Sequence, residues 1–468
     1  MTVYKKSIHT LENTTVAIKQ SPHGDELVVS GLNPGFSGIQ HGDVLIAPKT
    51  HENAMLLREM FPFTAPKPVL SNKWTIGLGD RLGIATPGHM RALAQFDAVP
   101  VFAQQSIREL TLTNRTFADV LDAVTFAVFR EDFQWGYGAD GDHLKTESEI
   151  DYALSNGFTS ITLDCSEFIG NDVFDMSDEQ VASTYNLDKS LETLYCNKEF
   201  EIEGHVIKLT VNNLKRIMLI YESAVEFAET VYHRFIKGRN IDFEISIDET
   251  ITPTTPEQHF VVANELSRRK IQIQTLAPRF IGEFQKGIDY IGDISDFEKD
   301  FNFHAAIARH FGYKLSVHSG SDKFSIYPII GKGSQGVIHV KTAGTSWLEA
   351  MRVVAMKNPK LYRDVHAFAL DVFDQAKKYY HVTTDITKIP LLESVSDGEL
   401  PQLFDQADLR QLIHITYGLI LNAKDYEGKP CFKERLHNLW SEQQDLYSER
   451  LEQHIGKHLR LLHQGFGE

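Results

Sequence analysis

The stretch IDFEISIDE, residues 241–249, is the most informative segment for the fold. Its apolar and polar residues alternate, which is the two-residue period of a β-strand. One face of this strand carries Ile241, Phe243, Ile245 and Ile247, and the other carries Asp242, Glu244, Ser246 and Asp248. Strands of parallel α/β sheets are usually apolar on both faces, and buried carboxylates destabilise a fold unless they are paired. The segment therefore predicts either a polar interior satisfied by hydrogen bonds or a functional site.

Seven further strand-like segments alternate with helical patterns in the same part of the chain. They are TIGLGD (75–80), PVFAQQ (100–105), GADGDHLK (138–145), FTSITLDCS (158–166), IQIQTLA (271–277), KLSVHSG (314–320) and GVIHVKT (336–342). Capping patterns at Thr146, Thr255 and Ser295 mark the starts of three intervening helices. Eight βα units predict an α/β fold, a TIM-like (β/α)8 barrel. An open, doubly wound sheet with inserts has the same local pattern and is the alternative.

The barrel accounts for only part of the 468 residues. We expect an N-terminal extension over 1–73, the barrel over 74–345, and a helical C-terminal region over 346–468 that packs on it. A long insertion, 167–240, follows the fourth strand and contains a hairpin-like stretch, KEFEIEGHVIKLT, and a long helical pattern. We interpret it as an inserted subdomain or a lid.

Composition excludes several classes of protein. The chain has 47 Lys and Arg against 63 Asp and Glu, a formal charge of -16 that argues against nucleic-acid binding. No apolar run is long enough for a membrane helix, and the polar opening residues lack a signal peptide, so we expect no membrane partner and a cytoplasmic location. Three scattered cysteines predict no disulfides. The sequence leaves a homo-oligomer open.

Polar side chains gather where the predicted strands end, which is where barrel enzymes place their chemistry. His318 and His339 lie on the same face of adjacent strands, close enough to share a divalent ion if that face is the lumen. Asp142 and His143 lie together at another strand exit, where a carboxylate beside a metal ligand suits a general base. Asp164 is a competing ligand. A single histidine in a barrel is more often a satisfied core residue.

Basic residues and glycine-rich turns suggest an anionic substrate. Lys145, Arg279, Lys323 and Lys341 are candidates to neutralise a substrate carboxylate. Glycine-rich turns at 319–324, 331–336 and 342–346 follow the late strands, where barrels often bind phosphate. A phosphosugar is therefore one interpretation, and ordinary turns are the other. Nucleophile-elbow and Walker motifs are absent, which weighs against serine hydrolases and P-loop enzymes.

Several long segments together resemble one family, the tagaturonate/fructuronate epimerases of bacterial hexuronate metabolism. They are GLGDRLGIATPGHMRAL (77–93), FAQQSIREL (102–110), GADGDHLKT (138–146), ITLDCSEFI (161–169), APRFIGEFQKGIDYIGD (277–293), KLSVHSGSDKFSIYPIIGKG (314–333) and HVKTAGTSWLEA (339–350). The resemblance implies a metal-dependent isomerase that inverts C4 of a 2-keto-hexuronate, so that galacturonate enters the glucuronate route. Its substrate would be a small sugar acid.

The resemblance also implies roles for particular residues. Asp142 would be the proton acceptor and Glu249 the donor, with Asp248 as the alternative donor. The metal ligands would be His143, His318 and His339, while His304, in a helical segment, is a weaker candidate. The metal, Zn, Ni, Co, Mn or Fe, is left open because imidazole and carboxylate suit all of them.

The C4–H bond is only weakly acidic, so we expect inversion by retro-aldol cleavage of C3–C4, rotation of the aldehyde fragment and re-addition. A metal-dependent aldolase or ketose isomerase acting on a related sugar acid or phosphosugar is the alternative, and a non-catalytic sugar-acid binding protein is a third interpretation.

Overall fold

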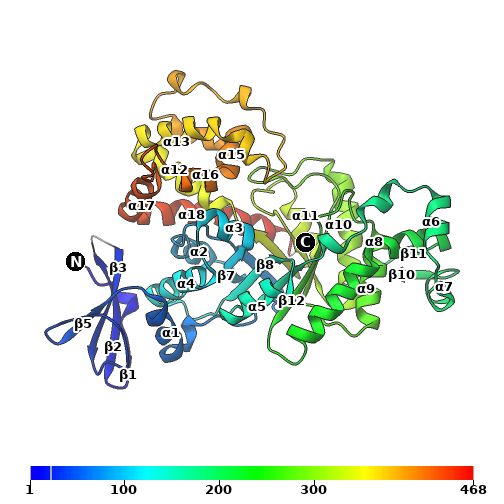
Figure 1. The fold of residues 1–468 in the computed structure, drawn as a ribbon, viewed down its shortest axis with the longest axis horizontal. Helices are drawn as coiled ribbons and strands as arrows, with labels where there is room; N and C mark the ends of the chain where they lie inside the picture. The colour runs from blue at the N-terminus through cyan, green and yellow to red at the C-terminus, as the bar shows by residue number, and fades with distance from the viewer. Residues whose placement is uncertain (1, 22–23, 467–468) are drawn as a thin grey trace.

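Eight parallel strands form a closed barrel at the centre of the computed structural model, which describes residues 2–21 and 24–466 (Figure 1). The order around the barrel is β12-β13-β14-β15-β6-β7-β8-β9, and β9 pairs with β12 to close it. The strands are β6 (Trp74–Leu78), β7 (Val99–Ser106), β8 (Gly138–Leu144), β9 (Ser160–Asp164), β12 (Asp242–Ile247), β13 (Thr275–Pro278), β14 (Lys314–Val317) and β15 (Ile338–Thr342). All eight predicted strands form, so the predicted (β/α)8 barrel is confirmed.

Helices surround the barrel and connect its strands, with the apolar core between the two layers. They are α2 (Thr86–Leu93), α3 (Ile107–Thr113), α4 (Phe117–Glu131), α5 (Glu147–Ser155), α8 (Val211–Val231), α9 (Pro256–Arg268), α10 (Ile294–Phe311) and α11 (Tyr327–Ser334). Thr146 and Thr255 form the predicted capping boxes of α5 and α9. The predicted start at Ser295 is wrong. The Asp293 side chain instead accepts a hydrogen bond from the Asp296 amide, so α10 begins at Ile294.

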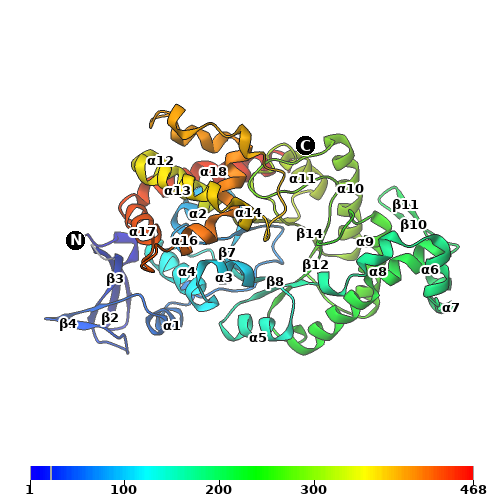
Figure 2. The same ribbon diagram turned by 45° about the horizontal axis from the view of Figure 1, so that its top comes forward.

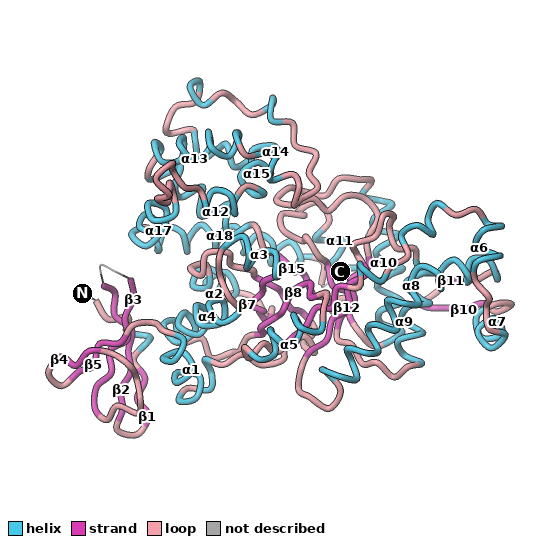
Figure 3. Tube along the Cα trace, in the orientation of Figure 1, coloured by secondary structure: helices cyan, strands magenta, loops and turns pink. Residues whose placement is uncertain are grey.

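Residues before the barrel form a small antiparallel sheet with strand order β1-β2-β3-β5-β4, seen at the lower left of Figure 1 and in magenta in Figure 3. The elements are β1 (His9–Leu11), β2 (Thr14–Ser21), β3 (Gly24–Gly31), β4 (Ile39–His41), β5 (Val44–Ala47) and α1 (His51–Met60). One face of this sheet buries Val16, Ile18 and Leu27 against Phe126 and Phe129 of α4. The sheet is therefore fixed to the outer helical layer of the barrel.

The insertion after β9 lies at the side of the barrel, at the right of Figures 1 and 2. It contains α6 (Asp178–Thr184), α7 (Lys189–Tyr195) and the predicted hairpin, β10 (Glu199–Ile202) with β11 (His205–Lys208). The hairpin contacts the outer helices α9 and α10, where Arg309 of α10 forms an ion pair with Glu203 at 2.6 Å. The long helical pattern that follows is α8, which completes the fourth βα unit of the barrel.

The chain after β15 is helical, and it covers one end of the barrel (Figure 2). Its helices are α12 (Thr345–Lys357), α13 (Pro359–Asp371), α14 (Phe373–Ala376), α15 (Ala407–Ile415), α16 (Tyr417–Asn422), α17 (Lys433–Glu442) and α18 (Gln444–Gln464). The last of them, α18, packs against α2, α11 and α12. Among the helices of the described residues, none combines the length and the apolar character needed to cross a membrane.

Candidate active site

An irregularity in β8 brings two neighbouring side chains into the barrel mouth. Adjacent residues of a regular strand point to opposite faces. Here the pairing of β8 with β9 shifts between Gly141 and Leu144, and His143 has a left-handed backbone, φ 55°. Such a bulge re-aims side chains. As a result, Asp142 and His143 both line the same cavity.

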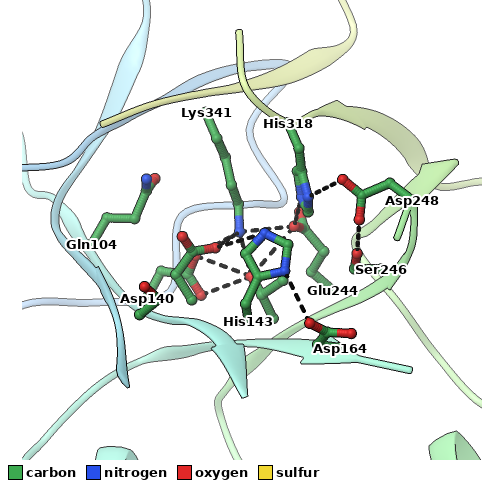
Figure 4. Close-up of polar contacts among 12 residues, drawn as sticks. Gln104, Asp140, His143, Asp164, Glu244, Ser246, Asp248, His318 and Lys341 are labelled. Carbon is green, nitrogen blue, oxygen red and sulfur yellow. Dashed lines mark hydrogen bonds and ion pairs between the residues drawn. The ribbon is translucent and has the colours of Figure 1, made fainter. Parts of the chain in front are cut away.

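His143 meets His318, which follows β14, at the mouth of the barrel (Figure 4). The two imidazole rings lie 4.8 Å apart between centroids, and ligand atoms of His143, His318 and Asp248 all lie within 4.8 Å of one another. His318 sits between two carboxylates: Nδ1 is 3.1 Å from Oδ2 of Asp248, and Nε2 is 2.7 Å from Oε1 of Glu244. Burial disfavours the charged imidazole, but these carboxylates raise the pKa of His318 to about 10. The two carboxylates therefore stabilise positive charge at this position.

A buried lysine joins the acidic side chains below this pair (Figure 4). The Nζ atom of Lys341, on β15, lies 2.8 Å from Asp140, 2.9 Å from Asp142 and 2.9 Å from Glu244, and it also donates to Thr162. Burial opposes both charges, yet the ion pairs hold the pKa of Lys341 well above its ordinary value. They hold the pKa of Asp142 well below its ordinary value. Asp142 is thus kept ionised.

A second group of ligand atoms adjoins the first. Nδ1 of His143 lies 3.4 Å from Oδ2 of Asp164, and these two atoms are buried without a well-formed hydrogen bond. Glu249 completes this group, and Lys145 lies 3.5 Å from Asp164 and 3.6 Å from Glu249. Buried polar atoms normally have partners. An imidazole nitrogen and carboxylate oxygen atoms this close together, without well-formed hydrogen bonds, fit a divalent metal ion.

The cavity above these residues has a volume of about 390 Å³, which suits a small ligand. Strand ends supply its floor, and the C-terminal helical region supplies Tyr379, Tyr380, His381 and His414. None of the described residues between 167 and 240 lines it.

The sequence profile of the tagaturonate epimerase family, UxaE, matches residues 4–462. The chain belongs to the tagaturonate epimerase family. A tagaturonate/fructuronate epimerase from Thermotoga maritima is 40% identical over 474 residues, covering 98% of this chain and 96% of that protein. The native crystal structure of the fructuronate-tagaturonate epimerase UxaE from Cohnella laeviribosi shares 48% identity and a TM-score of 0.96, covering 98% of this chain and 96% of that one. A glycerol-complexed structure of that protein matches equally well.

Most of the residues predicted for this tagaturonate epimerase family member come together. Those that line the cavity are Asp142, His143, Glu249, Arg279, His318 and Lys341. Lys145 contacts Glu249 from one side. Arg279 is held by the carbonyl oxygen of Thr250 and lies 4.0 Å from Glu283.

Three candidates lie elsewhere. His339 faces the barrel interior one layer below His318, and its Nδ1 is hydrogen bonded to Thr75 at 2.8 Å. Lys323 is buried outside the cavity lining and donates to the carbonyl oxygens of Gln285, Ile288 and Ser321. His304 lies on α10, where its ring contacts His259 and the carbonyl oxygen of Thr254. The structure therefore brings none of these three to the His143–His318 pair.

Sequence reasoning assigned no specific role to several residues of the site. Asp140 and Glu244 carry the alternation signal of buried strands, but their ion pairs with Lys341 depend on the closed barrel. Arg108, Lys286 and His414 line the cavity from helices and loops, where no local pattern marks them. The glycine-rich 331–336 segment is no phosphate loop, since Gly331 and Gly333 lie within α11 and pack against α18 and α10.

Proposed function

We propose that this protein is an epimerase that inverts C4 of a 2-keto-hexuronate and interconverts D-tagaturonate and D-fructuronate. One observation carries the proposal: His143, His318 and Asp248 form a ligand cluster beside Asp142 and Glu249, in a chain of the tagaturonate epimerase family. The relative from Thermotoga maritima is named for this activity. With it, the protein serves the breakdown of galacturonate.

His143, His318 and Asp248 are the residues we propose to hold a divalent metal ion, with Asp164 as a further oxygen donor. A bound divalent cation polarises a ketone or hydroxyl oxygen and stabilises negative charge that develops on it. The close approach of Nδ1 of His143 and Oδ2 of Asp164, 3.4 Å apart and both buried, supports this assignment, because within the described residues neither atom has a well-formed hydrogen bond in place of a metal.

Asp142 and Glu249 divide the proton transfers. Asp142 is ionised, since the ammonium group of Lys341 stabilises its charge, and it accepts the proton of the C4 hydroxyl. Glu249 has a half-exposed side chain at the cavity wall, 3.6 Å from Lys145, and donates a proton to the C4 alkoxide that re-addition produces. The two acids act from different strands, β8 and the exit of β12.

Loss of the C4 hydroxyl proton permits cleavage of the C3–C4 bond, which leaves a C4 aldehyde and an enediolate fragment. Rotation of the aldehyde and re-addition to its other face invert the centre. Atoms are conserved, because the bond that breaks forms again. The enclosing residues of the C-terminal region would keep both fragments in the cavity until re-addition.

The test is conversion of D-tagaturonate followed by NMR, with protein treated with a chelator and then supplied with one divalent metal at a time. We expect D-fructuronate to appear with a restoring metal, and no three-carbon product to accumulate. Release of three-carbon fragments would identify an aldolase instead. Persistence of tagaturonate with every metal, in folded protein, would contradict the proposed substrate.

A further inference from the structure

A second cluster in the cavity is basic, unlike the acidic floor. Arg81, Arg108 and Lys286 line it, against the single carboxylate of Glu109. Arg81 is paired with Glu109, with 2.9 Å between Nε and Oε1. Within the described chain, no carboxylate forms an ion pair with Arg108 or Lys286. Neither of these two cations is therefore in direct contact with a carboxylate of the described residues.

Lys286 and Arg108 are held toward the cavity by neutral groups. The Nζ atom of Lys286 donates to the hydroxyl of Ser319 at 2.8 Å, and the Arg108 guanidinium lies 4.8 Å from the ring centroid of Tyr380. A lysine ammonium has three donors, and one hydrogen bond to a hydroxyl leaves two for a ligand. Both cationic groups can therefore donate further hydrogen bonds to a ligand in the cavity.

His414, on α15, adds an unpartnered polar ring beside these cations. It is only 1% exposed, and neither ring nitrogen has a hydrogen-bond partner within the described residues. The ring approaches the chain so closely that a Cβ atom on Gly344 would lie 1.5 Å from Nε2. A buried imidazole without partners loses hydrogen-bond energy unless a ligand supplies them. His414 lines the same cavity as Lys286.

The loop that carries Lys286 is fixed in place. Lys323 donates to the carbonyl oxygens of Gln285 and Ile288, and Arg410 donates through Nε to that of Gly287 at 2.7 Å. These bonds fix the backbone on both sides of Lys286. Fixed groups lose little entropy when they bind a ligand, which is the condition for selective recognition.

We propose that Arg108, Lys286 and His414 form the subsite that binds the carboxylate of the sugar acid. The identity of that acid rests on the proposed function. A carboxylate accepts charge-assisted hydrogen bonds from the two cations and one from the imidazole. With its carboxylate held in this subsite, the substrate binds in one direction, with its reacting carbons toward His143 and His318, which line the same cavity.

Binding of D-galactonate tests the subsite without requiring turnover. This acid has the six-carbon length and the carboxylate but no ketone, and galactitol is its neutral counterpart. By calorimetry we expect wild-type protein to bind galactonate more tightly than galactitol. Lys286→Met should weaken galactonate binding about 100-fold and leave galactitol binding unchanged, as for loss of one partner of a desolvated charge pair. Lys286→Arg should retain most of the affinity.

Lys332→Met is the matched control, because it removes the same charge from an exposed position on α11. Near-ultraviolet circular dichroism checks that each variant is folded. If Lys286→Met does not fold, then Arg108→Met and His414→Gln carry the same comparison. Equal binding of galactonate and galactitol by the wild type, or unchanged galactonate binding in folded variants, would overturn the subsite.

Catalysis separates the subsite from the proposed function. In an epimerase with this subsite, Lys286→Met lowers kcat/KM for tagaturonate and leaves that for the neutral ketose D-tagatose unchanged. A wild type that leaves tagaturonate unchanged but binds galactonate through Lys286 would contradict the function and support the subsite. Inorganic phosphate is the competing ligand. If phosphate displaces galactonate and binds more tightly than galactonate, the subsite binds phosphate and not carboxylate, and the substrate is a phosphosugar.

Discussion

The Nζ atom of Lys341 lies 2.9 Å from Oδ1 of Asp142, and both groups are buried inside the barrel. We predict that Lys341→Met moves the acid limb of kcat/KM to higher pH. Burial alone raises the pKa of a carboxyl group, and Lys341 is the strongest of the charges that hold the pKa of Asp142 low, ahead of His143 and His318. The base must be ionised, so activity disappears as pH falls through a pKa that is now higher.

A pH profile of kcat/KM for both proteins measures this shift. Lys145→Met is the control, because Lys145 pairs with Asp164 and Glu249 and makes no ion pair with Asp142 among the described residues. The control should leave the acid limb in place. An acid limb at the same pH in folded Lys341→Met would show that Asp142 is not the acceptor.

Metal content should follow His143 and His318 and not His339. We predict that His143→Ala or His318→Ala weakens divalent metal binding by more than about 100-fold, since even residues behind the ligands contribute 10–100-fold. His339→Gln should keep its metal and lose about 1 kcal/mol of stability with the hydrogen bond to Thr75. Elemental analysis after dialysis measures both. If His318→Ala retains its metal and His339→Gln loses it, then His339 is the metal ligand and His318 is not.

Substitutions of Glu249 and Asp248 should cause different defects: loss of turnover at Glu249 and loss of metal at Asp248. Glu249→Gln is expected to lower kcat by about 10²–10⁴, the usual contribution of a general acid, with metal content preserved. Asp248→Asn should instead release metal, because Asp248 lies within the ligand cluster and 3.1 Å from His318. Single-turnover rates and metal content on the same samples distinguish them. Full kcat in Glu249→Gln would transfer the donor role elsewhere.

Lys323 should matter for stability. Lys323→Met leaves three buried carbonyl oxygens without their donor, and an unsatisfied buried polar group costs about 1–3 kcal/mol. We expect a loss of at least about 3 kcal/mol in the free energy of unfolding, measured by urea denaturation. The exposed Lys332→Met should change it by less than about 0.5 kcal/mol. Equal midpoints for the two variants would contradict this role.

The barrel could be predicted because its signal is local. Each strand shows either period-two alternation or a short apolar run, and turn residues or caps mark the ends. Both interpretations of the alternating segment IDFEISIDE hold: some of its polar residues are satisfied by hydrogen bonds in the interior, and others belong to the candidate site. Asp242 accepts hydrogen bonds from the amides of Val69 and Leu70 beneath the barrel, while Asp248 lies in the ligand cluster.

The positions of the inward-facing side chains along the barrel axis could not be predicted from the sequence. Ser316 pairs with His339 across β14 and β15, so His318 lies level with Lys341 and one layer above His339. That register is set by barrel closure and leaves no trace in either strand's own sequence. The bulge that turns His143 inward is likewise a property of the pairing between β8 and β9.

Because Tyr380 and His414 follow all eight barrel strands in the sequence, the cavity wall that they form is made after the barrel strands. A nascent chain that has just emerged from the ribosome with all eight strands still lacks one wall of the pocket. Domains generally fold as they are made, from the N-terminus onward. The carboxylates and histidines of the site are therefore enclosed only after residues 379–414 have been made.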